Sequence, residues 1–338
     1  MVAVNRRGFL ISTMTCAGAL RAQPQNEQAQ TFLAGLIPSG GGPAGDRGVP
    51  AGAAGAAGGG GVPGAGGAPG SASRTSAARL EYFWRAGDEC SRLGVHNIEV
   101  NTTNSQIVQT YDTRLSEFKD EMSKRNLRMV GFAMYAHSHE TDKRRELIED
   151  HLRVARFLKA VGGRYIAELL APAANLGDGD DESYRKADLK AIAANINEVG
   201  KRVREETGID MGYHPEQGDI RAGIVDRLLN ETDPRYFNFW PDIGHFAACG
   251  ADPLEVYRKY RSRMVGTHLR DFAPAAGADA TGQPGKGRMV PFGQGTVNLP
   301  ALIQFLRQTK FTGCVIGEGG GGSQAMRDYM VGTLGLKL

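Results

Sequence analysis

Acidic side chains and histidines recur where short apolar runs of the sequence end. Asp242 and His245 close the run that contains FNFW, and His268 and Asp271 close the next one. Glu318 follows the apolar run CVIG in the same way. Carboxylates and imidazoles are the groups that bind divalent metal ions and that move protons in catalysis. The repeated ending predicts that several strands deliver such groups to one place.

Two further apolar runs end in the same kind of residue. His214 and Glu216 lie in MGYHPEQGD, and Glu168 lies in RYIAELLAP. An Asp, a His and one or two Glu around one point offer the oxygen and nitrogen donors that suit Mn²⁺, Mg²⁺, Co²⁺, Fe²⁺ or Zn²⁺. A cation would also relieve the repulsion among clustered carboxylates. The sequence therefore predicts one bound divalent metal ion, with Mn²⁺ as the first choice.

The elements that carry these residues alternate between strand and helix patterns. Amphipathic stretches follow apolar runs that suit strands, because parallel neighbours in a sheet need a crossover connection. The strand candidates are residues 31–38, 96–101, 127–137, 164–172, 209–216, 236–245, 263–272 and 313–319. Eight such units over roughly 250 residues are the size of an α/β (β/α)₈ TIM barrel. An open doubly wound sheet is the alternative. Its Gly-rich phosphate fingerprint is not found after the first strand, because the glycines at 40–70 are far too many and lack the context of that motif.

A barrel explains why the polar residues stand at strand ends. The carboxyl ends of all eight strands meet at one mouth, and catalytic groups come from several of them. The polar ends of five separate strands are therefore expected to lie close together in space, although they are far apart along the chain.

The composition fits a domain that binds a small molecule. The chain has 338 residues, 41% hydrophobic and 23% charged, with a net charge of +3 and no long basic run, so a nucleic-acid partner is not expected. Residues 1–22, within MVAVNRRGFLISTMTCAGALRAQ, resemble a twin-arginine signal peptide. Its apolar run is too short to span a bilayer. We therefore expect an exported or periplasmic protein without stable membrane insertion.

The expected domain organisation is simple. Residues 23–338 form a single TIM-barrel domain, interrupted at about 39–75 by a Gly-rich segment. That segment has almost no apolar side chain to bury, so we expect a disordered insertion. The sequence leaves the oligomeric state open, a homo-oligomer included.

Four segments in order carry a family resemblance. PDIGHFAACGADP, VGTHLRDF, VPFGQGTVNLPALIQFLRQTKFTG and VIGEG resemble the xylose isomerase-like TIM-barrel superfamily, the sugar phosphate isomerase/epimerase and endonuclease IV group. The resemblance covers most of residues 76–338 and implies that Asp242, His268 and Glu318 ligate a metal ion. It also implies that His245 touches the substrate, for which the alternative is a hydrogen bond to a ligand carboxylate.

The fifth strand departs from this pattern. Epimerases of the group place a ligand Glu where this chain has Gly212. Alternation along a strand aims Gly212, His214 and Glu216 at the same side. Glu216, or else Glu168 from the neighbouring strand, is thus the candidate fourth ligand, and the division of His214 and Glu216 between ligand and acid–base roles stays open.

Several neighbouring residues have two interpretations each. Arg270 and Asp271 either pair with each other or orient His268. Glu99, at the end of the second strand, either has a structural role or forms a hydrogen bond that holds a metal ligand in place. His137 and His139, in YAHSHE after the third strand, either line the mouth or belong to a solvated loop.

The predicted activity is proton transfer beside a metal-polarised carbonyl. We expect a divalent-metal-dependent isomerase or epimerase that acts on a sugar, keto-sugar or polyol. The candidate catalytic residues are Glu168, His214, Glu216 and His245. If the same site expels a hydroxyl group, the enzyme is instead a dehydratase or lyase of a keto-sugar or keto-glycoside. A non-catalytic sugar-binding barrel is the alternative from outside the enzymes.

Overall fold

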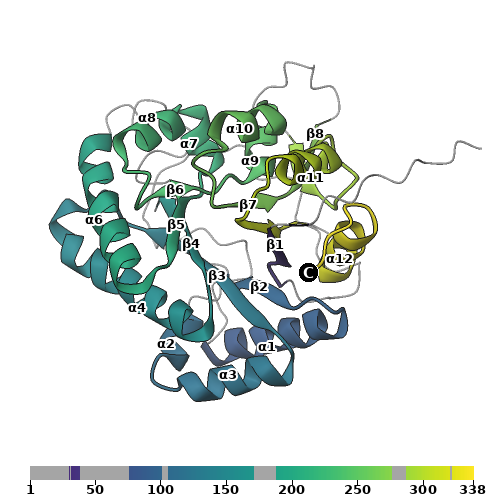
Figure 1. Ribbon diagram of the computed structural model, residues 1–338, viewed down its shortest axis with the longest axis horizontal. Helices are drawn as coiled ribbons and strands as arrows, with labels where there is room; N and C mark the ends of the chain where they lie inside the picture. The colour runs from purple at the N-terminus through teal and green to yellow at the C-terminus, as the bar shows by residue number, and fades with distance from the viewer. Residues whose placement is uncertain are drawn as a thin grey trace, which may run out of the picture.

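Eight parallel strands surrounded by helices form a nearly closed barrel (Figure 1). The computed structural model describes residues 30, 32–38, 76–100, 106–170, 188–275, 287–319 and 322–338. The barrel strands are β1 Leu33–Leu36, β2 Asn97–Val100, β3 Arg128–Ala136, β4 Tyr165–Leu170, β5 Asp210–Tyr213, β6 Asn238–Phe239, β7 Gly266–Leu269 and β10 Cys314–Gly317. Their order in the sheet is β6-β5-β4-β3-β2-β1-β10-β7. The TIM-barrel prediction is confirmed.

The two end strands of this sheet, β6 and β7, meet along a sparse seam. Isolated bridges pair Phe239 with Met264 and Asp242 with His268 in the parallel sense. The seam hydrogen bonds include His268 N to Pro241 O at 2.9 Å. Since β6 spans only two residues before Pro241, few ladder bonds are available, and the barrel closes through single bridges there.

Helices cover the outside of the barrel (Figure 1). Their bounds are α1 Ser76–Arg92, α2 Gln106–Tyr111, α3 Leu115–Lys124, α4 Arg144–Val161, α6 Leu189–Thr207, α7 Gln217–Arg221, α8 Ile224–Glu231, α9 Ile243–Ala248, α10 Pro253–Tyr260, α11 Leu299–Gln308 and α12 Gly322–Gly332, with a 3₁₀ turn, η2, at Thr141–Lys143. Helices α4 and α6 end at Gly162 and Gly208, both in the left-handed conformation that glycine adopts without strain. Asp252 caps α10 by accepting from Leu254 N.

A small antiparallel hairpin interrupts the strand–helix alternation after β7. It consists of β8 Asp271–Pro274 and β9 Gly287–Val290. The sequence predicts one strand over residues 263–272, so this hairpin differs from the expected pattern. The hairpin begins immediately after Arg270, so it shapes the region beside the carboxyl end of β7.

The interior of the barrel is filled by side chains rather than open. Trp240 and Tyr165 stack there with ring centroids 3.9 Å apart. Both side chains are fully buried, with at most 1% of their surface exposed. Gly266 on β7 leaves room for Trp240, because a Cβ at Gly266 would lie 1.6 Å from that ring. The larger apolar core lies between the strands and the helices. The packed interior forms a floor, so chemistry is confined to the mouth.

The structure corrects the prediction for Glu168. Ala167 and Leu169 belong to the cluster inside the barrel, so Glu168 between them faces the outer helices. Its Oε2 lies 3.2 Å from His151 Nε2 on α4, and both side chains are almost fully buried. Glu168 is therefore part of the packing between β4 and α4 and not a group at the mouth.

This buried ion pair makes stability depend on pH. Burial alone would lower the pKa of His151, but the adjacent Glu168 carboxylate outweighs it and raises the pKa. The second ring nitrogen, Nδ1, donates to Leu147 O at 2.7 Å, so the charged imidazolium is the form that both partners favour. A raised folded-state pKa contributes stability that is present below the unfolded value of about 6.5 and is lost as pH rises through the folded value.

We therefore expect the free energy of unfolding to fall as pH rises above about 6.5, as measured by urea denaturation at a series of pH values. His151→Gln removes the titrating group, and Glu168→Gln removes its partner's charge. Each variant should flatten this slope, and each should destabilise the fold by about 3 kcal/mol or more, because one buried partner remains unpaired. A slope that persists unchanged in both variants would assign it to other groups.

Some sequence predictions fall outside the described residues. The proposed signal peptide at 1–22 and the Gly-rich insertion at 39–75 both do, so they stay predictions. In the part of the chain that the structure describes, no helix combines the length and apolar character needed to cross a membrane.

Candidate metal centre

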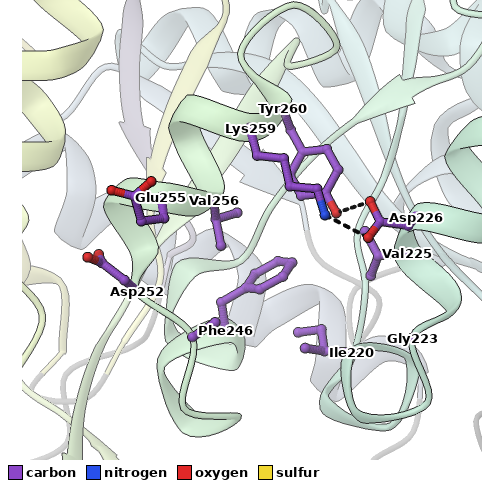
Figure 2. Close-up of a pocket in the computed structure, with 11 residues that line it drawn as sticks. Ile220, Gly223, Val225, Asp226, Phe246, Asp252, Glu255, Val256, Lys259 and Tyr260 are labelled. Atoms are coloured by element: carbon purple, nitrogen blue, oxygen red, sulfur yellow. Dashed lines mark hydrogen bonds and ion pairs between the residues drawn. The ribbon is translucent and has the colours of Figure 1, made fainter.

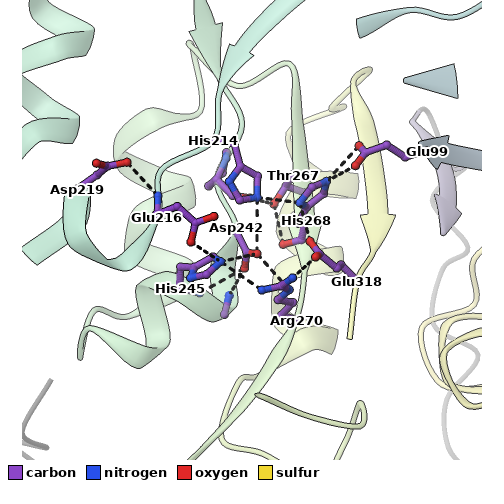
Figure 3. Close-up of polar contacts among 12 residues, drawn as sticks. Glu99, His214, Glu216, Asp219, Asp242, His245, Thr267, His268, Arg270 and Glu318 are labelled. Carbon is purple, nitrogen blue, oxygen red and sulfur yellow. Dashed lines mark hydrogen bonds and ion pairs between the residues drawn. The ribbon is translucent and has the colours of Figure 1, made fainter. Parts of the chain in front are cut away.

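Two histidines and two carboxylates converge at the mouth of the barrel (Figure 3). His214 follows β5, Asp242 follows β6, His268 lies on β7 and Glu318 follows β10, and one donor atom of each lies within 4.8 Å of the others. The first three side chains are buried and Glu318 is partly exposed. The structure thus brings together the three residues implied as ligands by the family resemblance, and His214 takes the fourth place.

The spacing of the donor atoms fits a single cation. His268 Nδ1 lies 2.9 Å from His214 Nε2 and 3.0 Å from Glu318 Oε2. His214 Nε2 lies 3.7 Å from Asp242 Oδ2. Donors bound at about 2.1 Å around one ion are about 3.0–3.4 Å apart. Asp242 Oδ2 is also buried and accepts no hydrogen bond among the described residues, although Arg270 Nε and His245 Nε2 lie 3.2 and 3.3 Å from it. A cation at the cluster would give this charged oxygen a direct partner.

Asp242 is held in place by the helix that it begins. Its Oδ1 accepts from Gly244 N at 2.9 Å and from His245 N at 3.2 Å, so it is the N-cap of α9. This arrangement fixes the carboxylate and leaves Oδ2 facing the cluster. His245 therefore lies within α9, whereas the sequence analysis placed it at the end of a longer sixth strand.

Glu99 orients His268 from below. The two Glu99 oxygens lie 3.0 and 3.1 Å from His268 Nε2, and Tyr165 OH donates to Glu99 Oε2 at 2.7 Å. A carboxylate at Nε2 favours the tautomer that carries its proton there, which leaves the Nδ1 lone pair for a metal ion. Of the two interpretations of Glu99, the geometry matches support of a candidate ligand.

A Glu99→Gln variant is expected to bind divalent metal roughly 10- to 100-fold more weakly, because its amide no longer fixes the His268 tautomer. Titration calorimetry with Mn²⁺ would measure this change. Tyr165→Phe is the matched control, since it removes one hydrogen bond to Glu99 and keeps the carboxylate. A smaller loss in Tyr165→Phe than in Glu99→Gln is the expected order, and equal affinity in Glu99→Gln and wild type would contradict this role.

Burial keeps His214 in the neutral form that can act as a ligand. Removal from water, together with the neighbouring His268, lowers the pKa of His214 well below its usual value, although Asp242 opposes the shift. A neutral imidazole carries a free lone pair on one nitrogen. No thiolate belongs to the cluster, so the donor set suits a borderline divalent ion.

Glu216 lies beside the cluster rather than in it. Its Oε2 is 3.5 Å from His245 Nε2, and the same His245 nitrogen is 3.3 Å from Asp242 Oδ2. Figure 3 shows Glu216 and His245 together on one flank, with Glu318 on the other. Burial raises the pKa of Glu216. The sequence suggested Glu216 as the fourth ligand, but in the structure His214 and not Glu216 completes the cluster. That either residue binds a metal ion stays a prediction.

Gly212, where the resemblance expects a ligand Glu, has little space for a side chain. A Cβ there would lie 3.0 Å from Val265 and 3.1 Å from Trp240. The packed floor thus occupies the room that a longer side chain would need. His214, two residues further along the chain, reaches the cluster from the same side of β5.

Arg270 and Asp271 have separate partners. Arg270 contacts Glu318 through Nη2, and its Nε and Nη1 lie 3.2 Å from Asp242 Oδ2 and His245 Nε2, respectively. It joins the two carboxylates of the cluster, a contact that the sequence analysis did not foresee. Asp271 accepts instead from backbone N–H groups of Phe272, Gly293, Gly295 and Val297. The Asp271 side chain therefore fastens the GQGTVNLP loop beside the mouth.

A separate groove of about 290 Å³ lies in the outer helical layer, among residues of α7, α8, α9 and α10 (Figure 2). Asp226 there accepts from Lys259 Nζ and Tyr260 OH, both at 2.6 Å. None of the sequence-predicted site residues lines this groove. The polar cluster at the mouth is therefore the better candidate for chemistry.

Comparisons with known proteins agree with this fold. A family model described as Xylose isomerase-like TIM barrel matches residues 88–328. An inosose dehydratase of Bacillus cereus (strain AH820) is 24% identical over 175 residues, which cover 49% of this chain and 58% of that protein. The chain matches between 30% and 58% of the length of such curated relatives.

Two solved structures share the fold. A xylose isomerase-like TIM barrel protein from Mycobacterium smegmatis, in complex with magnesium, has a TM-score of 0.57 at 16% identity, covering 78% of this chain and 90% of that one. The 3-keto-D-glucoside 4-epimerase YcjR from E. coli has a TM-score of 0.52 at 16% identity, covering 75% and 94%. At such identities the likeness concerns the fold alone.

Proposed function

This chain belongs to the xylose isomerase-like TIM barrel family, and from that membership we propose that it is a divalent-metal-dependent dehydratase of a polyhydroxylated ketone, such as a keto-sugar. The observation that carries the proposal is that, among the described residues, one pair of proton-transfer groups lies on a single flank of the cluster. Glu216 and His245 form a pair 3.5 Å apart on one flank of the four-residue cluster. Removal of a proton and departure of a hydroxyl from the same face need only one such pair.

The metal ion is proposed from the donor set. His214, Asp242, His268 and Glu318 would hold it. Two imidazole nitrogens among four donors favour Mn²⁺, Fe²⁺, Co²⁺ or Zn²⁺ over Mg²⁺, which prefers oxygen ligands. When bound, such an ion supplies Lewis acidity that polarises a carbonyl oxygen and eases removal of the proton on the neighbouring carbon.

The side chains of the flank then perform the proton transfers. His245 takes the proton from the carbon next to the carbonyl on its Nε2 lone pair, in exchange for the contact that this nitrogen makes with Arg270 Nη1 at 3.2 Å. Glu216 stabilises the imidazolium that forms. The protonated His245 returns that proton to the hydroxyl on the following carbon. This hydroxyl leaves as water, and a carbon–carbon double bond conjugated to the carbonyl remains. The floor formed by Trp240 and Tyr165 closes the site from below.

Isomerisation or epimerisation, which the sequence predicted first, is the second candidate. It begins with the same proton removal but returns the proton to carbon, and an epimerase must do so on the opposite face. The curated relatives named inosose dehydratases support the elimination, whereas the likeness to YcjR supports the epimerase at the level of the fold.

Incubation of the Mn²⁺-loaded protein with a panel of keto-sugars, keto-glycosides and keto-cyclitols in D₂O separates these candidates. We expect an unsaturated ketone, detected by its ultraviolet absorption and by NMR, with loss of one water. Deuterium incorporated at carbon without loss of water would establish epimerisation or isomerisation instead. Absence of both signals across the panel would favour a non-catalytic sugar-binding barrel.

A further inference from the structure

The turn after β3 carries a second group of metal-binding side chains. His137, His139 and Glu140 each offer a donor atom within 4.8 Å of the others. The two imidazole rings lie 5.9 Å apart between centroids. His137 is exposed and the other two are half-buried. In the part of the chain that the structure describes, neither ring has a hydrogen-bond or ion-pair partner, so none of these residues competes with a ligand for the ring nitrogens.

The turn is fixed by the buried residue at its centre. Ser138 is 1% exposed; its Oγ donates to Glu168 Oε1 at 3.1 Å, and its carbonyl accepts from Asn195 Nδ2 at 2.9 Å. Arg144 Nε in turn donates to Asn195 Oδ1 at 2.6 Å. Ser138 thus points into the outer layer, whereas His137 is exposed and His139 is half-buried.

A backbone turn brings Glu140 close to His137. Glu140 N donates to His137 O at 3.0 Å, which closes a tight turn. Among the described residues, the Glu140 carboxylate pairs with Lys143 Nζ at 3.1 Å, and the lysine side chain of this pair is half-exposed. Exposed pairs of this kind contribute about 0–1 kcal/mol, so a divalent cation can displace the lysine.

We propose that His137, His139 and Glu140 form a second divalent-cation site on the rim of the barrel. Two imidazoles and one carboxylate suit Zn²⁺, Ni²⁺ or Cu²⁺, and three protein ligands leave positions for water or another molecule. A turn that is already fixed loses little conformational freedom on binding. The site lies at the carboxyl end of β3, on the same end of the barrel as the central cluster. It does not depend on the proposed dehydratase activity.

The test counts bound metal. Full-length protein stripped with a chelator is titrated with Zn²⁺ alone, followed by calorimetry and by metal analysis after desalting. The wild type is expected to bind two equivalents, and Asp242→Asn, which disrupts the central cluster, is expected to bind one. His139→Asn should also bind one, and the double variant none. His137→Asn should lose one equivalent of metal, as His139→Asn does. Because His137 is exposed, its replacement is not expected to disturb the fold, so misfolding would not explain that loss.

His96→Asn is the matched control, because His96 is another partly exposed histidine, outside both clusters. It should leave the count at two. One equivalent in the wild type that disappears in Asp242→Asn would overturn the proposal. Two equivalents that persist in both His137→Asn and His139→Asn would likewise overturn it, since the second ion would then be bound elsewhere on the surface.

Discussion

An Asp242→Asn variant is expected to fold normally, to lose the centrally bound metal ion and to lose at least about 10³-fold in kcat. Asparagine is as good an N-cap as aspartate, so the bonds to Gly244 N and His245 N are retained. What disappears is the negative charge of Oδ2, which three nitrogens approach within 3.7 Å. The substitution therefore separates ligation from folding.

Metal affinity for this variant is best measured in a His139→Asn background, where the rim site does not contribute. Circular dichroism and thermal melting without metal report the fold. Unchanged metal affinity in Asp242→Asn would remove the central cluster as the metal site. A collapse of the metal-free melting temperature would show that the carboxylate charge, and not only the cap, stabilises the fold.

A His245→Gln variant is expected to keep its metal ion and to lose roughly 10²- to 10⁴-fold in kcat, which is the usual contribution of a positioned acid–base group. His245 is not one of the four convergent donors, so metal stoichiometry should equal that of the wild type. The loss should fall on kcat rather than on KM, because the proton transfer occurs only in the transition state.

Glu216→Gln is the matched comparison for this prediction. It keeps the shape of the side chain and removes the charge that faces His245 Nε2 at 3.5 Å. We expect a decrease in kcat smaller than that of His245→Gln, with metal content unchanged. The opposite order would identify Glu216 as the group that takes the proton. Loss of metal in Glu216→Gln would restore it as a ligand, as the sequence analysis first placed it.

The convergence of the polar strand ends was predictable from the sequence because parallel strands share one carboxyl edge. The count of strands and the position of each strand's end placed Asp242, His268 and Glu318 at the mouth, and the family resemblance singled them out as candidate ligands. Glu168 was misplaced because β4 is buried on both faces, and such a strand has no polar–apolar alternation from which its inward side can be read. The residues of β4 on either side of Glu168 are all apolar, although Ala167 and Leu169 pack inside the barrel and Ile166 and Leu170 pack against the outer helices.

Other features depended on contacts between distant segments. His245 was assigned to a strand because FNFW suggested a long one, but Pro241 cannot donate to a ladder, and α9 begins at once. The choice of His214 over Glu216 rests on how far β5 extends before its chain turns into α7. Arg270 gave no signal beyond its position, since its partners are 28 and 48 residues away in the chain.

The sparse seam between β6 and β7 gives the candidate metal ion a mechanical consequence. Asp242 and His268 are themselves one of the two bridges that join these strands. His214 and Asp242 stand on one side of the joint, and His268 and Glu318 stand on the other. An ion held by all four would therefore tie β6 to β7 across this sparse seam, so loading the site with metal would also strengthen the closure of the barrel.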